Sequence, residues 1–143
     1  MDEHLKSIWE GINESCFDGE LEELLAIDWG PISGPGTMEA FGRYIPRSKC
    51  MIIADRFQFD ADKIQAGDKK EEAKAEVAYR LMVHEMIHQA LHQKQAPSPG
   101  QHRDAFIAEA TRIAERLQTQ APIDETESAG WPNVAGLLLE FEI

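Results

Sequence analysis

The chain has 143 residues and an acidic balance, with 26 Asp and Glu against 14 Lys and Arg and a formal charge of −12 at pH 7. This length predicts a single domain with a substantial core. The acidic net charge argues against binding to duplex DNA, which requires clustered Lys and Arg. No apolar run is long enough to span a membrane, and residues 1–11 lack the apolar stretch of a secretory signal. Because the chain has only two cysteines, Cys16 and Cys50, we expect a reducing, cytoplasmic location.

The first half of the chain predicts one amphipathic helix followed by a small sheet. Leu5, Trp9 and Ile12 recur at helical spacing, which predicts a helix over residues 2–16. Short apolar runs predict strands at residues 27–29, 38–45 and 49–54. A loop rich in Gly and Pro is expected at 30–36, and a polar, irregular stretch with room for one turn of helix at 56–69. The pattern indicates an α+β fold with a three-stranded antiparallel or mixed sheet packed on helices.

The second half predicts two long helices and a tail. Residues 70–95 contain no Gly or Pro, and their apolar residues lie nearly all round the helix, as in a buried helix. Ser98, with Pro99 next and Gln101 three places on, resembles a capping box that starts a second helix, which runs to about residue 118. We therefore predict a domain over residues 1–118. An acidic linker and tail follow over 119–143, and the apolar end of the tail could dock on the domain.

The most informative motif is His84-Glu85-Met86-Ile87-His88, inside the first of these long helices. Residues four apart lie on one face of a helix, so His84 and His88 can reach one metal ion. Glu85 follows the first histidine, where its carboxylate can contact a metal-activated water. The motif predicts a Zn²⁺ site in a hydrolase, with Glu85 as the catalytic base that takes a proton from water and delivers it to a leaving nitrogen.

A catalytic zinc site needs a third protein ligand, and the chain offers three candidates. His92 continues the same helix face one turn further on, where it cannot easily join a tetrahedral site with the other two. Glu109 lies on the following helix, two turns beyond its first turn and so further from the mouth of the expected site. His102 lies in that first turn, near the mouth of the expected site, and is the preferred third ligand.

The order of these motifs resembles the SprT-like zinc metallopeptidases, the family of Spartan-type protease domains. The likeness covers roughly residues 5–118, and the elements that carry it are Asn13 with the run Phe17-Asp18-Gly19-Glu20-Leu21, Ile27-Asp28-Trp29, Ala40-Phe41-Gly42, Cys50-Met51-Ile52-Ile53-Ala54, the H-E-M-I-H helix, and Gly100, His102 and Phe106. The resemblance implies a zincin-like fold. It also implies His84, His88 and His102 as zinc ligands and Glu85 as the base of a zinc endopeptidase. Two features depart from the family: Gln101 and Arg103 flank His102, where members often have Gly-His-Gly, and the C-terminal four-cysteine zinc ribbon is missing.

The expected partner is a protein or peptide substrate, which we expect to pair as an extended chain with the strand at 49–54. Two other interpretations stay open. The chain could be a zinc-containing adaptor that binds proteins without cleaving them. It could instead cleave DNA-bound proteins when a partner delivers it to DNA, which the family suggests and the acidic charge does not favour. The sequence does not predict the oligomeric state.

Overall fold

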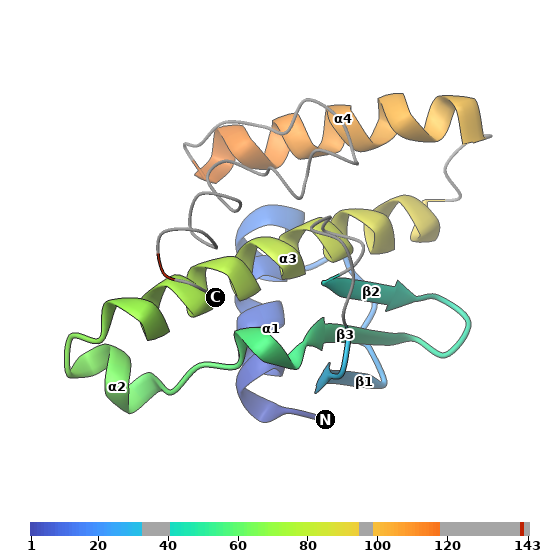
Figure 1. Cartoon of the computed structure of the whole chain (residues 1–143). Helices are drawn as coiled ribbons and strands as arrows, with labels where there is room; N and C mark the ends of the chain where they lie inside the picture. Colours follow the sequence, from blue (N-terminus) through green and yellow to red (C-terminus); the bar gives the residue numbers. More distant parts are fainter. Residues whose placement is uncertain (33–40, 95–98, 118–140, 142–143) are drawn as a thin grey trace.

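A small mixed sheet and four α-helices make up the described part of the chain, residues 1–32, 41–94, 99–117 and 141 of the computed structural model (Figure 1). In chain order the elements are α1 (Glu3–Phe17), β1 (Ala26–Gly30), β2 (Gly42–Ile45), β3 (Cys50–Ala54), the 3₁₀ turn η2 (Asp55–Phe57), α2 (Ala61–Gln65), α3 (Lys69–Gln93) and α4 (Pro99–Leu117). The predicted α+β class is therefore confirmed. Within the described ranges, no helix combines the length and apolar character needed to cross a bilayer. The predicted linker and tail lie almost entirely outside these ranges.

The first helix begins and ends where its sequence dictates. The side chain of Asp2 caps the N-terminus by accepting a hydrogen bond from the Leu5 amide at 2.8 Å. The helix stops because Asp18 adopts a left-handed conformation, with φ at 55°, and Gly19 continues it at 72°. The predicted helix at residues 2–16 is thus confirmed to within a residue at each end.

The sheet has the order β1-β3-β2, with β1 parallel and β2 antiparallel to β3. The hairpin between β2 and β3 turns through Lys49, whose φ of 53° is left-handed. Since β3 is paired on both sides, our prediction that the strand at 49–54 offers a free edge to substrate is wrong. Among the described strands, β2 is an edge, and it lies on the side of α3 (Figure 1). The predicted strand at 38–45 is confirmed from Gly42 onward, and residues 38–40 lie outside the described part.

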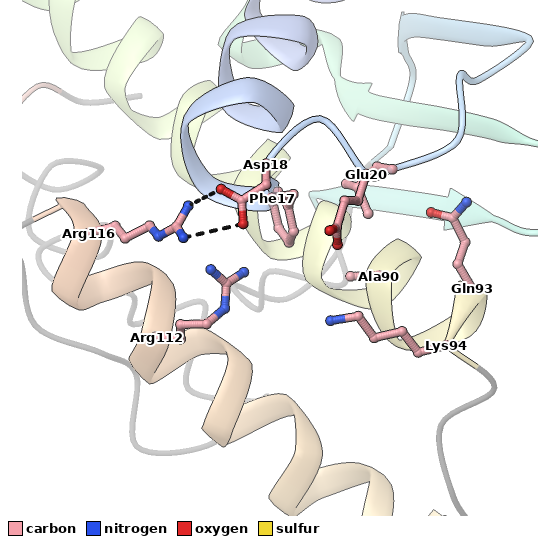
Figure 2. Close-up of a pocket in the computed structure, with 9 residues that line it drawn as sticks. Phe17, Asp18, Glu20, Ala90, Gln93, Lys94, Arg112 and Arg116 are labelled. Carbon is pink, nitrogen blue, oxygen red and sulfur yellow. Dashed lines mark hydrogen bonds and ion pairs between the residues drawn. The ribbon is translucent and has the colours of Figure 1, made fainter.

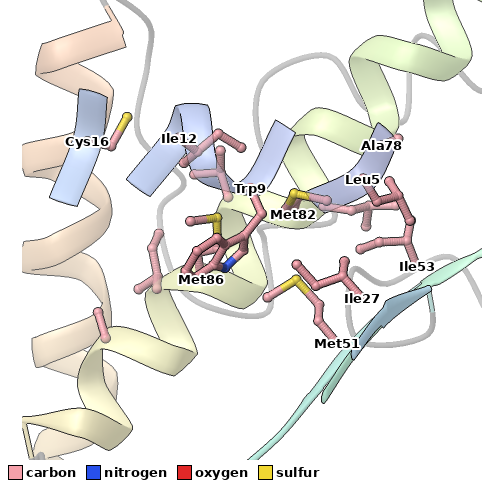
Figure 3. Packing of buried hydrophobic residues seen from close by; sticks show 14 of the residues in the cluster. Leu5, Trp9, Ile12, Cys16, Ile27, Met51, Ile53, Ala78, Met82 and Met86 are labelled. Carbon is pink, nitrogen blue, oxygen red and sulfur yellow. The ribbon is translucent and has the colours of Figure 1, made fainter. Parts of the chain in front are cut away.

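The core lies between α1, the sheet and α3, and α4 packs on α3 (Figures 1 and 3). Three methionines, Met51, Met82 and Met86, are fully buried at the centre, where their flexible side chains fill the space around Trp9. The indole Nε1 of Trp9 donates to Gln89 Oε1 at 3.2 Å, and Gln89 Nε2 donates to the Glu22 carbonyl at 2.8 Å. These two bonds tie α1 and the loop after it to the middle of α3.

The polar stretch at 56–69, expected to be irregular with room for one turn of helix, contains the end of η2 and the short helix α2. Gly67, with φ at 91°, then turns the chain toward α3. Asp68 caps α3, its carboxylate accepting from the Lys70 and Glu71 amides at 3.0 and 3.1 Å. The long helix therefore begins one residue before the predicted start and ends two residues before the predicted end.

Replacing Gly11 by Ala is expected to stabilise the fold by about 0.5–1 kcal/mol, because glycine inside a helix loses more backbone entropy than alanine. Gly11 is an exposed residue of α1, and a Cβ there meets no atom within 4 Å. Gly67→Ala is the matched control: a Cβ there also meets nothing, but φ is 91°, so we expect destabilisation. Urea unfolding of both variants measures the difference. Equal effects of the two substitutions would contradict this account.

Candidate metal centre

The two histidines of the motif face each other on α3. Their Nε2 atoms lie 3.2 Å apart, and the ring centroids are 4.8 Å apart. At this distance one imidazole can donate a hydrogen bond to the other in the metal-free chain. Two imidazole nitrogens on one tetrahedral zinc, each about 2.0–2.1 Å from it, would be about 3.3–3.4 Å apart. The observed spacing is therefore close to that of two ligands on a shared ion.

Burial sets the electrostatic state of His84. Its side chain is fully buried, and its Nδ1 has no hydrogen-bond partner among the described residues. Burial lowers the pKa of His84 well below its usual range, and the neighbouring His88 lowers it further. The imidazole is consequently neutral near pH 7, which is the form that binds metals. A buried ring with an unpartnered nitrogen is costly in a purely structural role.

Glu85 is buried beside the histidine pair and is held by the sheet. Its Oε2 accepts a hydrogen bond from the backbone amide of Tyr44, on β2, at 2.8 Å. Its Oε1 lies 4.0 Å from His84 Nε2. The carboxylate therefore lies beside the paired nitrogens, with Oε1 as the oxygen that the 4.0 Å distance joins to His84. This is the placement expected of a base that acts on a water near the metal.

Phe106 of α4 covers the two imidazoles. Its ring centroid lies 5.0 Å from that of His84 and 4.9 Å from that of His88, and the phenyl ring is fully buried. His88 itself is only half-buried, so the pair opens to solvent on its side. An apolar cover over one side of the pair lowers the local dielectric constant, which strengthens any interaction with a cation there.

The described residues do not supply a third ligand. Among them, no group of three or more His, Cys, Asp or Glu side chains converges to hold a metal. The Glu109 carboxylate is engaged by Arg112, and His92 is exposed, with its ring 6.1 Å from that of Tyr44. His102 does lie in the first turn of α4, as predicted, but its side chain is outside the described part. The structure thus brings His84, Glu85 and His88 together and leaves the His102 assignment as a prediction.

Comparisons with known proteins add no identification. No protein-family model, no curated protein and no solved structure matches the chain. The resemblance to the SprT-like family therefore remains an expectation from the sequence motifs alone.

Two contributors to the site were missed by the sequence reasoning. The Tyr44 amide is a backbone group, so no residue type reveals it, and Gly42 resembled an ordinary small residue of a strand. Gly42 and Tyr44 lie across from Ile53 and Met51, both fully buried, so they are on the sheet face turned toward the core. Strand alternation could have predicted that face, but not the contact with Glu85.

A separate pocket of about 380 Å³ lies between the end of α1, the end of α3 and α4 (Figure 2). On α3 it is lined by Ala90, which lies about 200° around the helix from His88, so it opens on a different face. Arg116 donates to the Ser15 carbonyl at 3.1 Å and to Asp18 Oδ1 at 3.0 Å, and this contact lowers the pKa of Asp18. A cation is favourable where helix carbonyls lack partners. These contacts explain Arg116 as a cap that joins α4 to α1, without any ligand.

Proposed function

We propose that this protein is a zinc-dependent endopeptidase of the SprT-like type with a zincin-like fold, and that its centre is the motif on α3. The observation that carries the proposal is the 3.2 Å approach of the His84 and His88 Nε2 atoms beside the buried Glu85 carboxylate. Each group has a role in metal-assisted hydrolysis, and together they are hard to explain as packing. A structural interpretation would leave a buried, partly unpartnered imidazole and a buried carboxylate at the centre of the longest described helix.

The donor set suits Zn²⁺. Imidazole nitrogen is a preferred zinc donor, and the neutral His84 has no proton to lose before binding. His84 and His88 would hold the ion from α3, and His102, on the helix that packs against α3, is the proposed third ligand. When bound, zinc supplies a Lewis acid for the substrate carbonyl and lowers the pKa of water to about 7.

Glu85 would carry the proton through the reaction. In the attack on the peptide carbonyl, its carboxylate accepts one proton from water while the new C–O bond forms. The same proton then passes to the leaving nitrogen as the C–N bond breaks, which regenerates the carboxylate and releases an acid and an amine. The hydrogen bond from Tyr44 to Oε2 leaves Oε1 as the oxygen nearer to the imidazole pair.

The position of β2 at the edge of the described sheet favours an extended peptide as the substrate. β2 borders α3, so an extended chain laid along it would pass the Glu85 carboxylate. Because the Tyr44 amide already donates to Glu85, the pairing would use the outward carbonyl groups of β2. Main-chain pairing of this kind gives affinity with little sequence preference. The edge strand β2 therefore takes the role that we had assigned to the strand at 49–54.

Elemental analysis and a cleavage assay on the purified wild-type protein test the proposal. We expect about one zinc per chain and cleavage of an unfolded protein substrate that stops with chelator and returns with zinc. Each assay is run with and without duplex DNA, since activity that appears only with DNA would identify the DNA-dependent form of the enzyme. Zinc without cleavage in either condition would replace the proposal by the adaptor interpretation. No zinc after reconstitution would overturn it.

A further inference from the structure

A backbone amide of the edge strand β2 donates a hydrogen bond to a side chain of α3. The Tyr44 N–H donates to Glu85 Oε2 at 2.8 Å, across 41 positions of the chain. In an antiparallel edge strand, alternate amides point away from the neighbouring strand and lack a partner in the sheet. Glu85 occupies one of these outward positions on β2.

Gly42, two residues before Tyr44 on the same strand, also lies next to Glu85. A Cβ built on Gly42 would lie 3.4 Å from Glu85 Cγ and 3.6 Å from Oε1. Gly42 does not have a positive φ, so the backbone does not require glycine there. A Cβ at these distances would be in ordinary van der Waals contact, so the backbone of β2 lies directly against the Glu85 side chain at Gly42 as well as at Tyr44.

A third contact fixes β2 along α3. The Tyr44 ring lies edge-on to His92, with centroids 6.1 Å apart. Glu85 and His92 are seven residues apart, which is about 10 Å along a helix. The strand therefore contacts α3 at Glu85 and at His92, on either side of His88, and these contacts place the Tyr44 amide next to the Glu85 carboxylate.

We propose that the backbone amide of Tyr44 positions Glu85 for proton transfer. The amide holds Oε2 and so fixes the rotation of the carboxylate, with Oε1 on the side of the histidines. A carboxylate held in one orientation avoids the entropic cost of finding it during the reaction. This inference rests on the proposed peptidase function, and it makes residue 44 a positioning residue through its backbone.

Replacing the amide of residue 44 by an ester removes the donor and keeps the tyrosine side chain. We expect zinc content and KM to stay as in the wild type and kcat to fall about ten- to hundredfold, the range for a lost hydrogen bond to a charged group. The same ester at Ala66 is the control, because the amide of this residue, which caps the C-terminus of α2, donates to the Asp62 carbonyl at 3.0 Å, away from the site. The Ala66 ester should keep the wild-type kcat. An ester at residue 44 with wild-type kcat would overturn the inference while leaving the peptidase proposal intact.

Hydrogen exchange tests the contact without any assay of activity. In the wild type the Tyr44 amide should exchange slowly, and in Glu85→Ala it should exchange at least tenfold faster, because its acceptor is gone. The Ala54 amide, which donates to the Phe41 carbonyl at 2.7 Å, should be unchanged in both proteins. Equal exchange of the Tyr44 amide with and without the Glu85 carboxylate would overturn the inference even if the protein proved inactive.

Discussion

Glu85→Gln is expected to keep zinc bound and to lower kcat by about 10²–10⁴-fold, the usual contribution of a general acid–base group. Glutamine has nearly the shape of glutamate, and its amide oxygen can still accept the hydrogen bond from Tyr44. It cannot take a proton from water at neutral pH. In the proposed site His84, His88 and His102 hold the metal, so zinc binding should not depend on the charge of Glu85.

Zinc content and the steady-state rate are measured on the same preparation of Glu85→Gln. Glu72→Gln is the matched control, since it makes the same chemical change on the same helix at an exposed position of the first turn. We expect the control to keep both zinc and activity. Loss of zinc from Glu85→Gln would instead identify Glu85 as a ligand, and full activity would remove it from the mechanism.

The helices were predictable because capping residues close to each start in the sequence set their boundaries. The carboxylates of Asp2 and Asp68 accept hydrogen bonds from amides two or three positions further along the chain. Asp is a preferred N-cap residue, so its place before a helical pattern indicates where α1 and α3 begin. The facing of His84 and His88 follows from the helical repeat alone, and the structure confirms it with 3.2 Å between the two rings' Nε2 atoms.

The strand order was not predictable from the same kind of evidence. Both strands of the hairpin have short apolar runs, and nothing local in them says which pairs with β1. The parallel pairing of Ile27 with Met51 joins residues 24 positions apart and depends on how α1 and α3 pack around the sheet. That long-range pairing made β3 central and β2 an edge of the described sheet, so the proposed substrate edge is β2. It also placed the Tyr44 amide over Glu85, a contact that no side-chain pattern encodes.

His88→Ala and His102→Ala are each expected to weaken zinc binding by more than the about 10–100-fold that follows loss of a residue supporting a ligand. Each substitution removes one of the three proposed protein ligands, and two ligands do not make a stable catalytic site. His88 is half-buried, so its replacement should disturb the fold less than replacement of the fully buried His84. Competition with a fluorescent chelator measures the affinity, and thermal unfolding without metal checks that each variant is folded.

His92→Ala is the control for the loss of zinc affinity expected in His88→Ala and His102→Ala. His92 lies one turn beyond His88 on the same helix but is exposed and packs edge-on to Tyr44, away from the paired Nε2 atoms. Its removal should leave zinc affinity unchanged. Zinc binding should also raise the free energy of unfolding of the wild type, by about 2.7 kcal/mol when free zinc is a hundredfold above Kd. This stabilisation by zinc should be lost in His88→Ala and His102→Ala and kept in His92→Ala. If His92→Ala lost zinc and His102→Ala kept it, the third ligand would come from α3 itself, and α4 would contribute to the site only through the cover that Phe106 provides.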